Sequence, residues 1–199
     1  ESIGLTFAAC LRSILRQDPD IILVGEVRDF ETAQMAIQSS LTGHLVLSTL
    51  HTNDAPTTIM RLVDMKVPPF LLASTIEGII AQRLVRVLCP RCKQEYRPTK
   101  QEIIELGLSD EKAQQMKFYK PVGCPFCRGG YKGRTGIFEI LLANESLWRA
   151  VLEDRPLGEI REIAINECHM KTLVEDGLQK INLGITSVEE VIKEVHGYG

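Results

Sequence analysis

The chain has 199 residues, and 44% of them are hydrophobic, which is enough for one domain or two small ones with a real core. Its net charge of −3 argues against a nucleic-acid binder that works through bulk charge. There is no run of about 18 apolar residues and no signal-peptide pattern, so we expect neither a membrane span nor export. The start at Glu1 suggests a segment cut from a larger protein.

The first part of the chain alternates between helix and strand signals. In chain order, the patterns predict a helix over 5–16, a strand over 21–24, a helix over 31–41, a strand over 45–50 and a helix over 56–65. Asp18-Pro19 ends the first helix, and Gly43 stands where a helix end favours a positive φ. This alternation predicts an α/β fold with a parallel sheet.

Glu26 follows directly after the predicted strand Ile21-Ile22-Leu23-Val24 and Gly25. In a parallel sheet, ligands gather at the carboxyl edge, where this acid is expected to lie. That position suits Mg²⁺ or water chemistry. The strand pattern by itself equally fits a solvated glutamate at the end of a strand.

Four of the six cysteines form two pairs, Cys89-Pro-Arg-Cys92 and Cys124-Pro-Phe-Cys127. Each Cys-x-x-Cys can direct two sulfurs at one ion, and four thiolates complete a closed tetrahedral Zn²⁺ shell. Such a site is structural because it leaves no open coordination position. The 31 intervening residues include a predicted helical insertion over 102–117. A disulfide or redox role is the alternative reading of the pairs.

The remaining cysteines, Cys10 in the first helix and Cys168 near a helix start, are expected to be ordinary small residues of the fold. The last third of the chain is predicted to be helical, with segments near 145–154, 157–166, 169–182 and 187–196. Ser187 and Glu190 have the spacing of a capping box. The expected core residues here are Trp148, Leu152, Ile160, Ile163 and Leu173.

Three motifs resemble those of the ATPases that power type II secretion and type IV pilus assembly. The segment over 15–29, with Arg16, Pro19, Asp20, Gly25, Glu26, Arg28 and Asp29 in register, is similar to their signature. The segment over 42–54, Thr-Gly-His-Leu-Val-Leu-Ser-Thr-Leu-His-Thr-Asn-Asp, resembles their histidine box. The segments over 82–92 and 127–136 resemble the entry to and exit from their tetracysteine zinc subdomain. Relatives that retract pili generally lack that subdomain, so the resemblance points to the assembly and secretion branch.

The resemblance implies a RecA-like P-loop ATPase that acts as a homohexamer. It also implies a cytoplasmic location, peripheral at the inner membrane, where ATP drives movement through a platform membrane protein. The expected parts are a partial ATPase core over 1–84, a zinc subdomain over 85–138 and a helical subdomain over 139–199. No nucleic-acid partner is expected.

The resemblance also implies residue roles. Glu26 would be the Walker B acid that acts on Mg²⁺ and the attacking water, and His51 would lie near the γ-phosphate. Arg28, Thr49 and Arg83 would contact the nucleotide. The two arginines would do so from a subunit interface. His51 also fits a hydrogen-bonded structural histidine, and lone arginines also fit surface ion pairs. His44 precedes its strand and is expected at the opposite edge.

One family element is absent from these 199 residues, namely the phosphate-binding Gly-x-x-x-x-Gly-Lys-[Ser/Thr]. The glycine-rich segment over 129–136 lacks Gly-Lys-Ser/Thr at the required spacing and follows a cysteine pair rather than a strand. We therefore expect the phosphate loop upstream of Glu1 and no ATPase activity from this chain alone. Two other classes stay open: a zinc-stabilised interaction module, and a nucleic-acid-binding zinc ribbon, which the excess of acidic residues disfavours.

Overall fold

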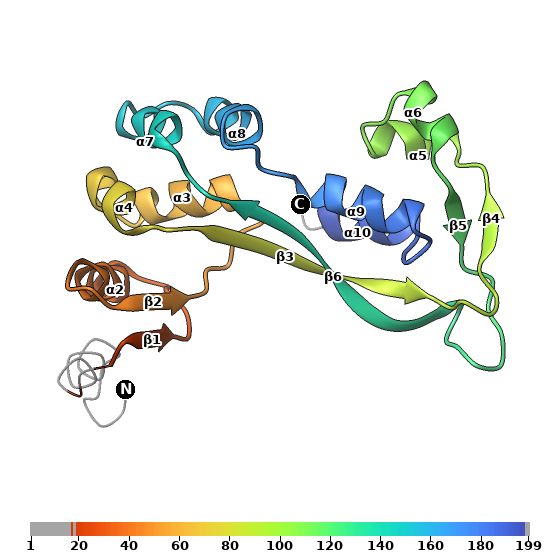
Figure 1. Ribbon diagram of the computed structural model, residues 1–199, viewed down its shortest axis with the longest axis horizontal. Coiled ribbons are helices and arrows are strands. Elements are labelled where there is room, and N and C mark those ends of the chain that lie inside the picture. The colour runs from red at the N-terminus through yellow and green to blue at the C-terminus, as the bar shows by residue number, and fades with distance from the viewer. Residues whose placement is uncertain (1–16, 18, 198–199) are drawn as a thin grey trace. The chain divides into compact units, whose positions relative to one another are not determined.

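A computed structural model describes residue 17 and residues 19–197 of the chain (Figure 1). The predicted helix over 5–16 and Cys10 lie outside the described residues. The helices and strands form two compact units. The first unit contains the described residues up to Ile79 together with Leu141–Met170, and the second contains Ile80–Ile140 and the described residues from Lys171 onward.

The first unit is built on a parallel pair of strands, as the sequence predicted. Its elements are β1 (Ile21–Val24), α2 (Phe30–Leu41), β2 (Leu45–Ser48), α3 (Ala55–Asp64), α4 (Pro69–Thr75), α7 (Glu145–Leu152) and α8 (Leu157–Asn166). Helix α2 packs against β2 and α4, while α8 packs against α3 and α7. The second predicted strand is shorter than expected and ends at Ser48. Gly43 has a φ of 97°, which confirms the predicted turn after α2.

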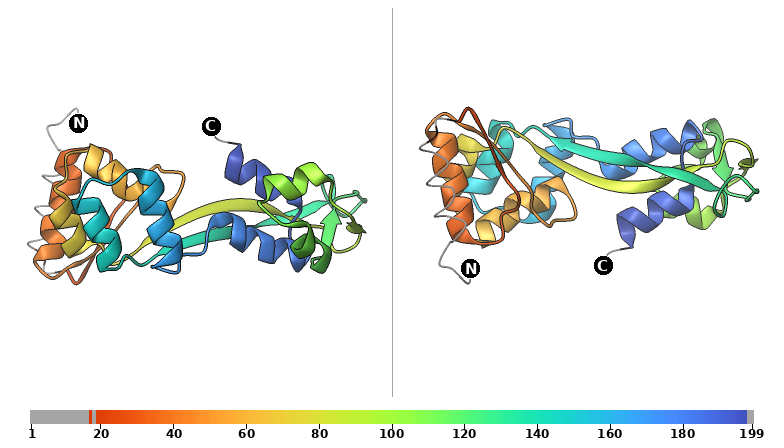
Figure 2. Two further views of the ribbon diagram at one scale, coloured as in Figure 1. Left: turned by 90° about the horizontal axis from the view of Figure 1, so that it is seen from above. Right: turned by 90° about the horizontal axis from the view of Figure 1, so that it is seen from below.

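The second unit is built on a long ribbon of two strands that the sequence analysis missed. Its elements are β3 (Ile79–Leu88), β4 (Gln94–Tyr96), α5 (Lys100–Glu105), α6 (Asp110–Gln115), β5 (Phe118–Lys120), β6 (Tyr131–Leu141), α9 (Leu173–Asn182) and α10 (Val188–His196). Strands β3 and β6 run side by side in every view (Figure 2). The predicted helical insertion over 102–117 is confirmed, although it is not one continuous helix. It is two short helices, because Gly107 turns the chain with a φ of 64° and Ser109 starts a new helix.

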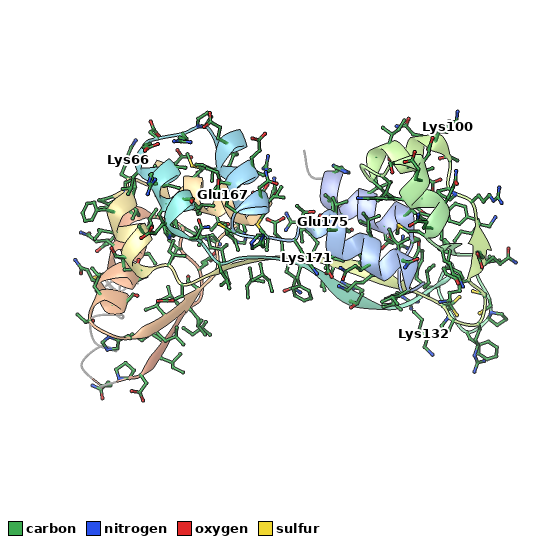
Figure 3. All side chains as sticks on the ribbon, turned by 45° about the horizontal axis from the view of Figure 1, so that its top comes forward. Lys66, Lys100, Lys132, Glu167, Lys171 and Glu175 are labelled. Atoms are coloured by element: carbon green, nitrogen blue, oxygen red, sulfur yellow. The ribbon has the colours of Figure 1, made fainter. Side chains whose placement is uncertain are left out.

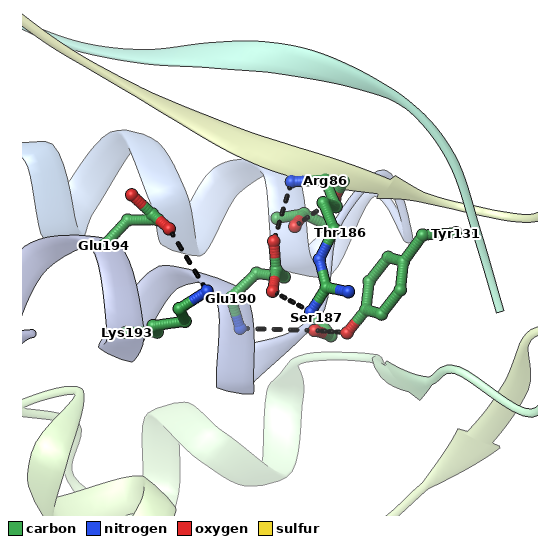
Figure 4. A network of polar contacts seen from close by, with 7 residues as sticks. All are labelled: Arg86, Tyr131, Thr186, Ser187, Glu190, Lys193 and Glu194. Atoms are coloured by element: carbon green, nitrogen blue, oxygen red, sulfur yellow. Dashed lines mark hydrogen bonds and ion pairs between the residues drawn. The ribbon is translucent and has the colours of Figure 1, made fainter. Parts of the chain in front are cut away.

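A buried acid ties helix α10 to strand β3 in the second unit (Figure 4). The side chain of Glu190 is only 2% exposed. One of its oxygens accepts the Arg86 backbone N–H at 2.9 Å, and the other accepts the Arg86 guanidinium. Burial raises the pKa of Glu190, but the bonds from Arg86 outweigh burial and hold that pKa below its usual range. The ionised Glu190 carboxylate therefore joins helix α10 to strand β3 through a hydrogen bond at each of its oxygens.

The predicted capping box at the start of α10 is only half formed. The Ser187 hydroxyl accepts the Glu190 N–H at 3.3 Å and lies 2.8 Å from the hydroxyl of Tyr131. The Glu190 carboxylate, which a full capping box would return to the backbone of Ser187, is bound to Arg86 instead. The guanidinium of Arg86 also lies over the Tyr131 ring, 4.0 Å from its centroid.

Most of the predicted core in the helical region is confirmed. Trp148, Ile160 and Leu173 are buried, and Ile163 packs against the core of the first unit. Leu152 was predicted wrongly. It is 55% exposed, because the preceding residue, Val151, takes the last inward position of α7.

Two further points concern the region over 139–199. Its first three residues belong to strand β6 rather than to a helix. Cys168 follows the end of α8 instead of preceding a helix, and it packs against the core of the first unit. The three-part division at 84 and 138 stays a prediction, since the two compact units divide the chain at other positions.

Candidate functional site

Two loops meet at the carboxyl edge of the β1–β2 pair. The strands are parallel, with Val24 opposite Ser48, so the residues after each strand leave from the same edge. The Val27 N–H donates to the Thr49 carbonyl at 2.9 Å, and the Thr49 hydroxyl donates to the Gly25 carbonyl at 2.7 Å. These two hydrogen bonds hold the loops together directly beyond the strands.

The loops bring one carboxylate and two nitrogen donors into contact. Nε2 of His51 lies 3.0 Å from Oε2 of Glu26, and Nε of Arg28 lies 2.7 Å from the same oxygen. The hydrogen bond from Arg28, followed by that from His51, lowers the pKa of Glu26 below its usual range. All three side chains reach solvent. Glu26 is therefore an ionised and accessible carboxylate, which can accept a hydrogen bond from water or bind a cation.

The structure thus gathers Glu26, Arg28, Thr49 and His51 at one edge. Arg83 is not part of this group, because it lies on β3 in the second unit, where its Nη1 donates to the Gln82 carbonyl at 3.2 Å. One further residue from the sequence analysis belongs to the other end of β2. His44 lies there, as its position before the strand predicted, with Nδ1 2.9 Å from the Ser39 carbonyl oxygen.

An ion pair beside this edge was missed by the sequence analysis. Asp54, the last residue of the segment that resembles the histidine box, is the N-cap of α3, and its Oδ1 accepts the Thr57 N–H at 2.8 Å. Its Oδ2 accepts Nη2 of Arg161 at 2.6 Å. Arg161 is 107 residues away in the sequence, so no local pattern could have indicated the pair. Burial raises the pKa of Asp54, but the bonds from Thr57 and Arg161 outweigh it and hold that pKa below its usual value.

We expect Asp54→Ala to lower the free energy of unfolding by about 1–2 kcal/mol at pH 7, because it removes a helix N-cap and the partner of Arg161. The folded-state pKa of Asp54 lies below the unfolded one, so this stabilisation is present above about pH 4 and is lost as the pH falls through the folded-state value. Urea unfolding at pH 7 and at pH 3 measures both effects. Asp54→Asn is the control and should cost less, since it keeps a capping oxygen. Equal stability of Asp54→Ala and wild type at pH 7 would contradict this account.

The four paired cysteines converge in the second unit, and none of them forms a disulfide. Their sulfurs all lie within 4.8 Å of one another. The Sγ–Sγ distances are 3.9 Å for Cys89 and Cys124, 3.7 Å for Cys92 and Cys127, and 3.6 Å for Cys124 and Cys127. Four sulfurs at about 2.3 Å from a tetrahedral Zn²⁺ are about 3.8 Å apart, so the cluster fits a metal ion of this kind.

The backbone around the cysteines explains this convergence. The Cys92 N–H donates to the Cys89 carbonyl at 3.3 Å, and the Cys127 N–H donates to the Cys124 carbonyl at 3.2 Å, so each pair closes a tight turn. The two turns are joined, because the Cys89 N–H donates to the Gly130 carbonyl at 2.8 Å. Gly130 has a φ of 88°, and a Cβ there would lie 2.4 Å from Pro121 Cβ, so only glycine fits.

The clustered thiols do not ionise alike, since the pKa of Cys124 is raised to about 11 and that of Cys92 is also raised. Desolvation raises the pKa of Cys127, but hydrogen bonds from Cys124 and from the backbone of Gly130 lower it to about 7. A thiolate is the form that binds metals. The cluster therefore has the ligand set, the spacing and the backbone of a metal site.

The α/β fold places this protein in the class of RecA-like ATPases. The cysteine cluster in the second unit adds a tetracysteine element to that fold. The family of type II/IV secretion system proteins matches residues 1–193, and the chain belongs to this family. In the part of the chain that the structure describes, no helix has the length and apolar character of a membrane span.

Individual relatives agree with this assignment. The type IV pilus assembly ATPase PilB of Thermus thermophilus is 50% identical over 190 residues, which cover 95% of this chain and 21% of that protein. The type II secretion system ATPase E of Vibrio cholerae is 47% identical over 196 residues, which cover 96% of this chain and 37% of that protein. The crystal structure of the pilus retraction motor PilT with bound ADP superimposes with a TM-score of 0.64 at 27% identity, over 95% of this chain and 43% of that one. The chain therefore spans between about a fifth and somewhat less than half of the length of these relatives.

Proposed function

We propose that the chain is the carboxy-terminal part of a homohexameric ATPase. The whole protein hydrolyses ATP to drive type II secretion or type IV pilus assembly through an inner-membrane platform protein, and it acts at the cytoplasmic face of that membrane. The observation that carries the proposal is the ionised Glu26 at the carboxyl edge of a parallel strand pair, with His51 and Arg28 bonded to it. The names of the relatives support the same activity.

In this proposal, Glu26 accepts a hydrogen bond and then a proton from the water that attacks the γ-phosphate. His51 holds the Glu26 carboxylate in place and lies beside it as a donor toward the phosphate. Thr49 fixes the loop that carries His51, and Arg28 supplies positive charge beside Glu26. Arg83, which is not part of this group, supplies positive charge from a subunit interface. Mg²⁺ bound with ATP would neutralise phosphate charge, and Glu26 is the carboxylate of this edge that would help to hold it. Positioning and charge are the main needs of phosphoryl transfer.

The four cysteines, in the same proposal, bind one structural Zn²⁺. Sulfur ligands in a tetrahedral arrangement are typical of zinc, and four of them leave no position for a substrate. The metal then stabilises the fold of the second unit and takes no part in ATP hydrolysis.

The proposal predicts a clear contrast between this chain and the longer protein that contains it. The 199 residues have no phosphate-binding Gly-Lys-[Ser/Thr] loop, so residues 1–199 should bind Mg-ATP no better than millimolar and should not hydrolyse it. The longer protein should do both. Calorimetric titration with Mg-ATP and a phosphate-release assay on the two proteins test this. Micromolar binding of Mg-ATP by residues 1–199 would contradict the claim that their nucleotide site is incomplete. A longer protein without ATPase activity would instead favour the zinc-stabilised interaction module.

A further inference from the structure

His51 is carried by a loop that its own side chain does little to fix. The loop over 49–54 joins β2 to α3. The side chain of His51 is 81% exposed, and its one hydrogen bond within the described part of the chain is the 3.0 Å contact with Glu26. The place of the imidazole beside Glu26 therefore depends on how the two ends of the loop are held.

The end of the loop at α3 is held in two ways. Contacts within the segment fix it to its own helix, because Oδ1 of Asp54 accepts the Thr57 N–H and the hydroxyls of Thr52 and Thr58 lie 2.7 Å apart. A second contact fixes it to another helix, because Nη2 of Arg161 donates to Oδ2 of Asp54 at 2.6 Å. The two carboxylate oxygens of Asp54 thus bind different helices, one α3 and the other α8.

Helix α8 is a firm support for this contact. It lies above α3 in Figure 1 and packs on α3 and α7. Figure 3 labels the residues that follow the two helices, Lys66 beyond α3 and Glu167 at the end of α8. Ile160 and Ala164 of α8 are fully buried in the core of the first unit. The backbone of Arg161 lies between these two anchors, so the guanidinium fixes the loop relative to the core.

The value of this ion pair lies in geometry more than in stability. Ion pairs between exposed side chains add little to stability, and the side chain of Arg161 is 44% exposed. Asp54 is only 22% exposed and is bonded to α3 as well, so its carboxylate has little freedom to move away from the loop. A change at Arg161 therefore acts on the loop over 49–54.

We propose that Arg161 is a positioning residue for ATP hydrolysis, which sets the loop over 49–54 through Asp54 and with it the contact between His51 and Glu26. This inference rests on the proposed function, in which Glu26 activates the attacking water. Among the described residues, no hydrogen bond or ion pair joins Arg161 to Glu26 or His51 directly. Misplacing a catalytic group by about 1 Å can slow a reaction ~10²-fold, so a change at this distance has a measurable effect.

The first test is the turnover of the longer protein with Arg161→Gln. We expect kcat to fall about tenfold while KM for ATP stays within about twofold of wild type, because the loop loses its second helix and the nucleotide contacts remain. Arg161→Lys should keep kcat within about threefold of wild type, since an ammonium can still donate to Oδ2 of Asp54. Thermal unfolding checks that each variant is folded at the assay temperature.

A double-mutant cycle shows whether Arg161 acts through Asp54. Asp54→Asn removes the ion pair but keeps a capping oxygen, so it should lower kcat about as much as Arg161→Gln does. Because the two residues act as one unit in this proposal, the double variant should be no slower than either single variant. Losses that multiply in the double variant would overturn the proposal.

The imidazole of His51 gives a readout that does not depend on activity. The 199-residue chain has four histidines, so its NMR spectrum with isotope-labelled histidine is simple. His51→Gln identifies the signal of His51, and Glu26→Gln shows how that signal shifts when the contact is lost. We expect Arg161→Gln to shift it in the same direction at the same pH. An unchanged His51 signal in folded Arg161→Gln would overturn the proposal.

The matched control is Arg155→Gln. The side chain of Arg155 is 43% exposed, much like that of Arg161, and its ion pairs among the described residues are with Glu153 and Glu159. Arg155→Gln should therefore keep kcat within about twofold of wild type and leave the His51 signal in place. Equal losses of turnover in Arg155→Gln and Arg161→Gln would overturn the proposal.

Glu26→Gln, measured in the same assay, separates this inference from the proposed function. Wild-type turnover of Arg161→Gln beside an inactive Glu26→Gln would overturn the role of Arg161 and leave the proposed function intact. Wild-type turnover of Glu26→Gln would overturn both, because no reaction at Glu26 would then remain for the loop to position.

Discussion

Replacing Glu26 by glutamine in the longer protein is expected to slow ATP hydrolysis at least ~10²-fold while ATP affinity stays nearly unchanged. The substitution keeps the size of the side chain and removes the charge. The ionised carboxylate is bonded to Arg28 and His51 and exposed at the strand edge, so its contribution is to the attacking water rather than to ground-state binding. Steady-state phosphate release and nucleotide titration measure the two quantities separately.

The control for this substitution is Glu31→Gln. Glu31 is an exposed acid in the first turn of α2, five residues further along the chain, and it should tolerate the same change with turnover close to wild type. Turnover of Glu26→Gln within about threefold of wild type would remove Glu26 from the catalytic role. Glu26 would then be a solvated acid at the end of a strand.

Loss of one cysteine is expected to have the largest effect on stability. Structural Zn²⁺ contributes an apparent ~10–16 kcal/mol in small zinc modules, which exceeds the typical stability margin of ~5–15 kcal/mol for a whole domain. Cys124→Ser should therefore abolish zinc binding and disorder the tetracysteine region. Elemental analysis should give one zinc per chain for wild type and none for the variant, and limited proteolysis should cut the variant between 85 and 138.

Cys168→Ser is the matched control, because Cys168 lies in the first unit and outside the cluster. It should keep one zinc per chain and wild-type resistance to protease. The zinc assignment fails if wild type purified without chelator contains no zinc and has four reactive thiols at the clustered positions. It also fails if Cys124→Ser resists protease as well as wild type does.

The candidate site was predictable because its signals are local. An apolar run followed by Gly25-Glu26 placed the acid after a strand, and the helix between the two strands implied a parallel pair. Parallel strands end at one edge, so the contact between Glu26 and His51 follows from the order of elements. The convergence of the cysteines was predictable for a similar reason, since each Cys-x-x-Cys closes its own turn.

The features that the sequence analysis missed depend on long-range pairing. Strand β3 has arginines among its apolar residues, and its partner β6 lies more than 40 residues further along the chain. Its strand character depends on that partner and on the helices that cover Val85. The Glu190 carboxylate shows the same limit. Its spacing from Ser187 predicts a capping box, but a backbone amide and a guanidinium 104 residues away in the sequence bind it more fully.

The central claim is that Glu26 acts in ATP hydrolysis, and the nucleotide that remains on the enzyme tests it most directly. The longer protein with Glu26→Gln is mixed with less than one equivalent of Mg-ATP, separated from free nucleotide after many wild-type turnover times, and its bound nucleotide is identified by chromatography. We predict that the variant retains ATP, whereas wild type and Glu31→Gln hold ADP or no nucleotide. Bound ADP on Glu26→Gln in the wild-type proportion would contradict the account.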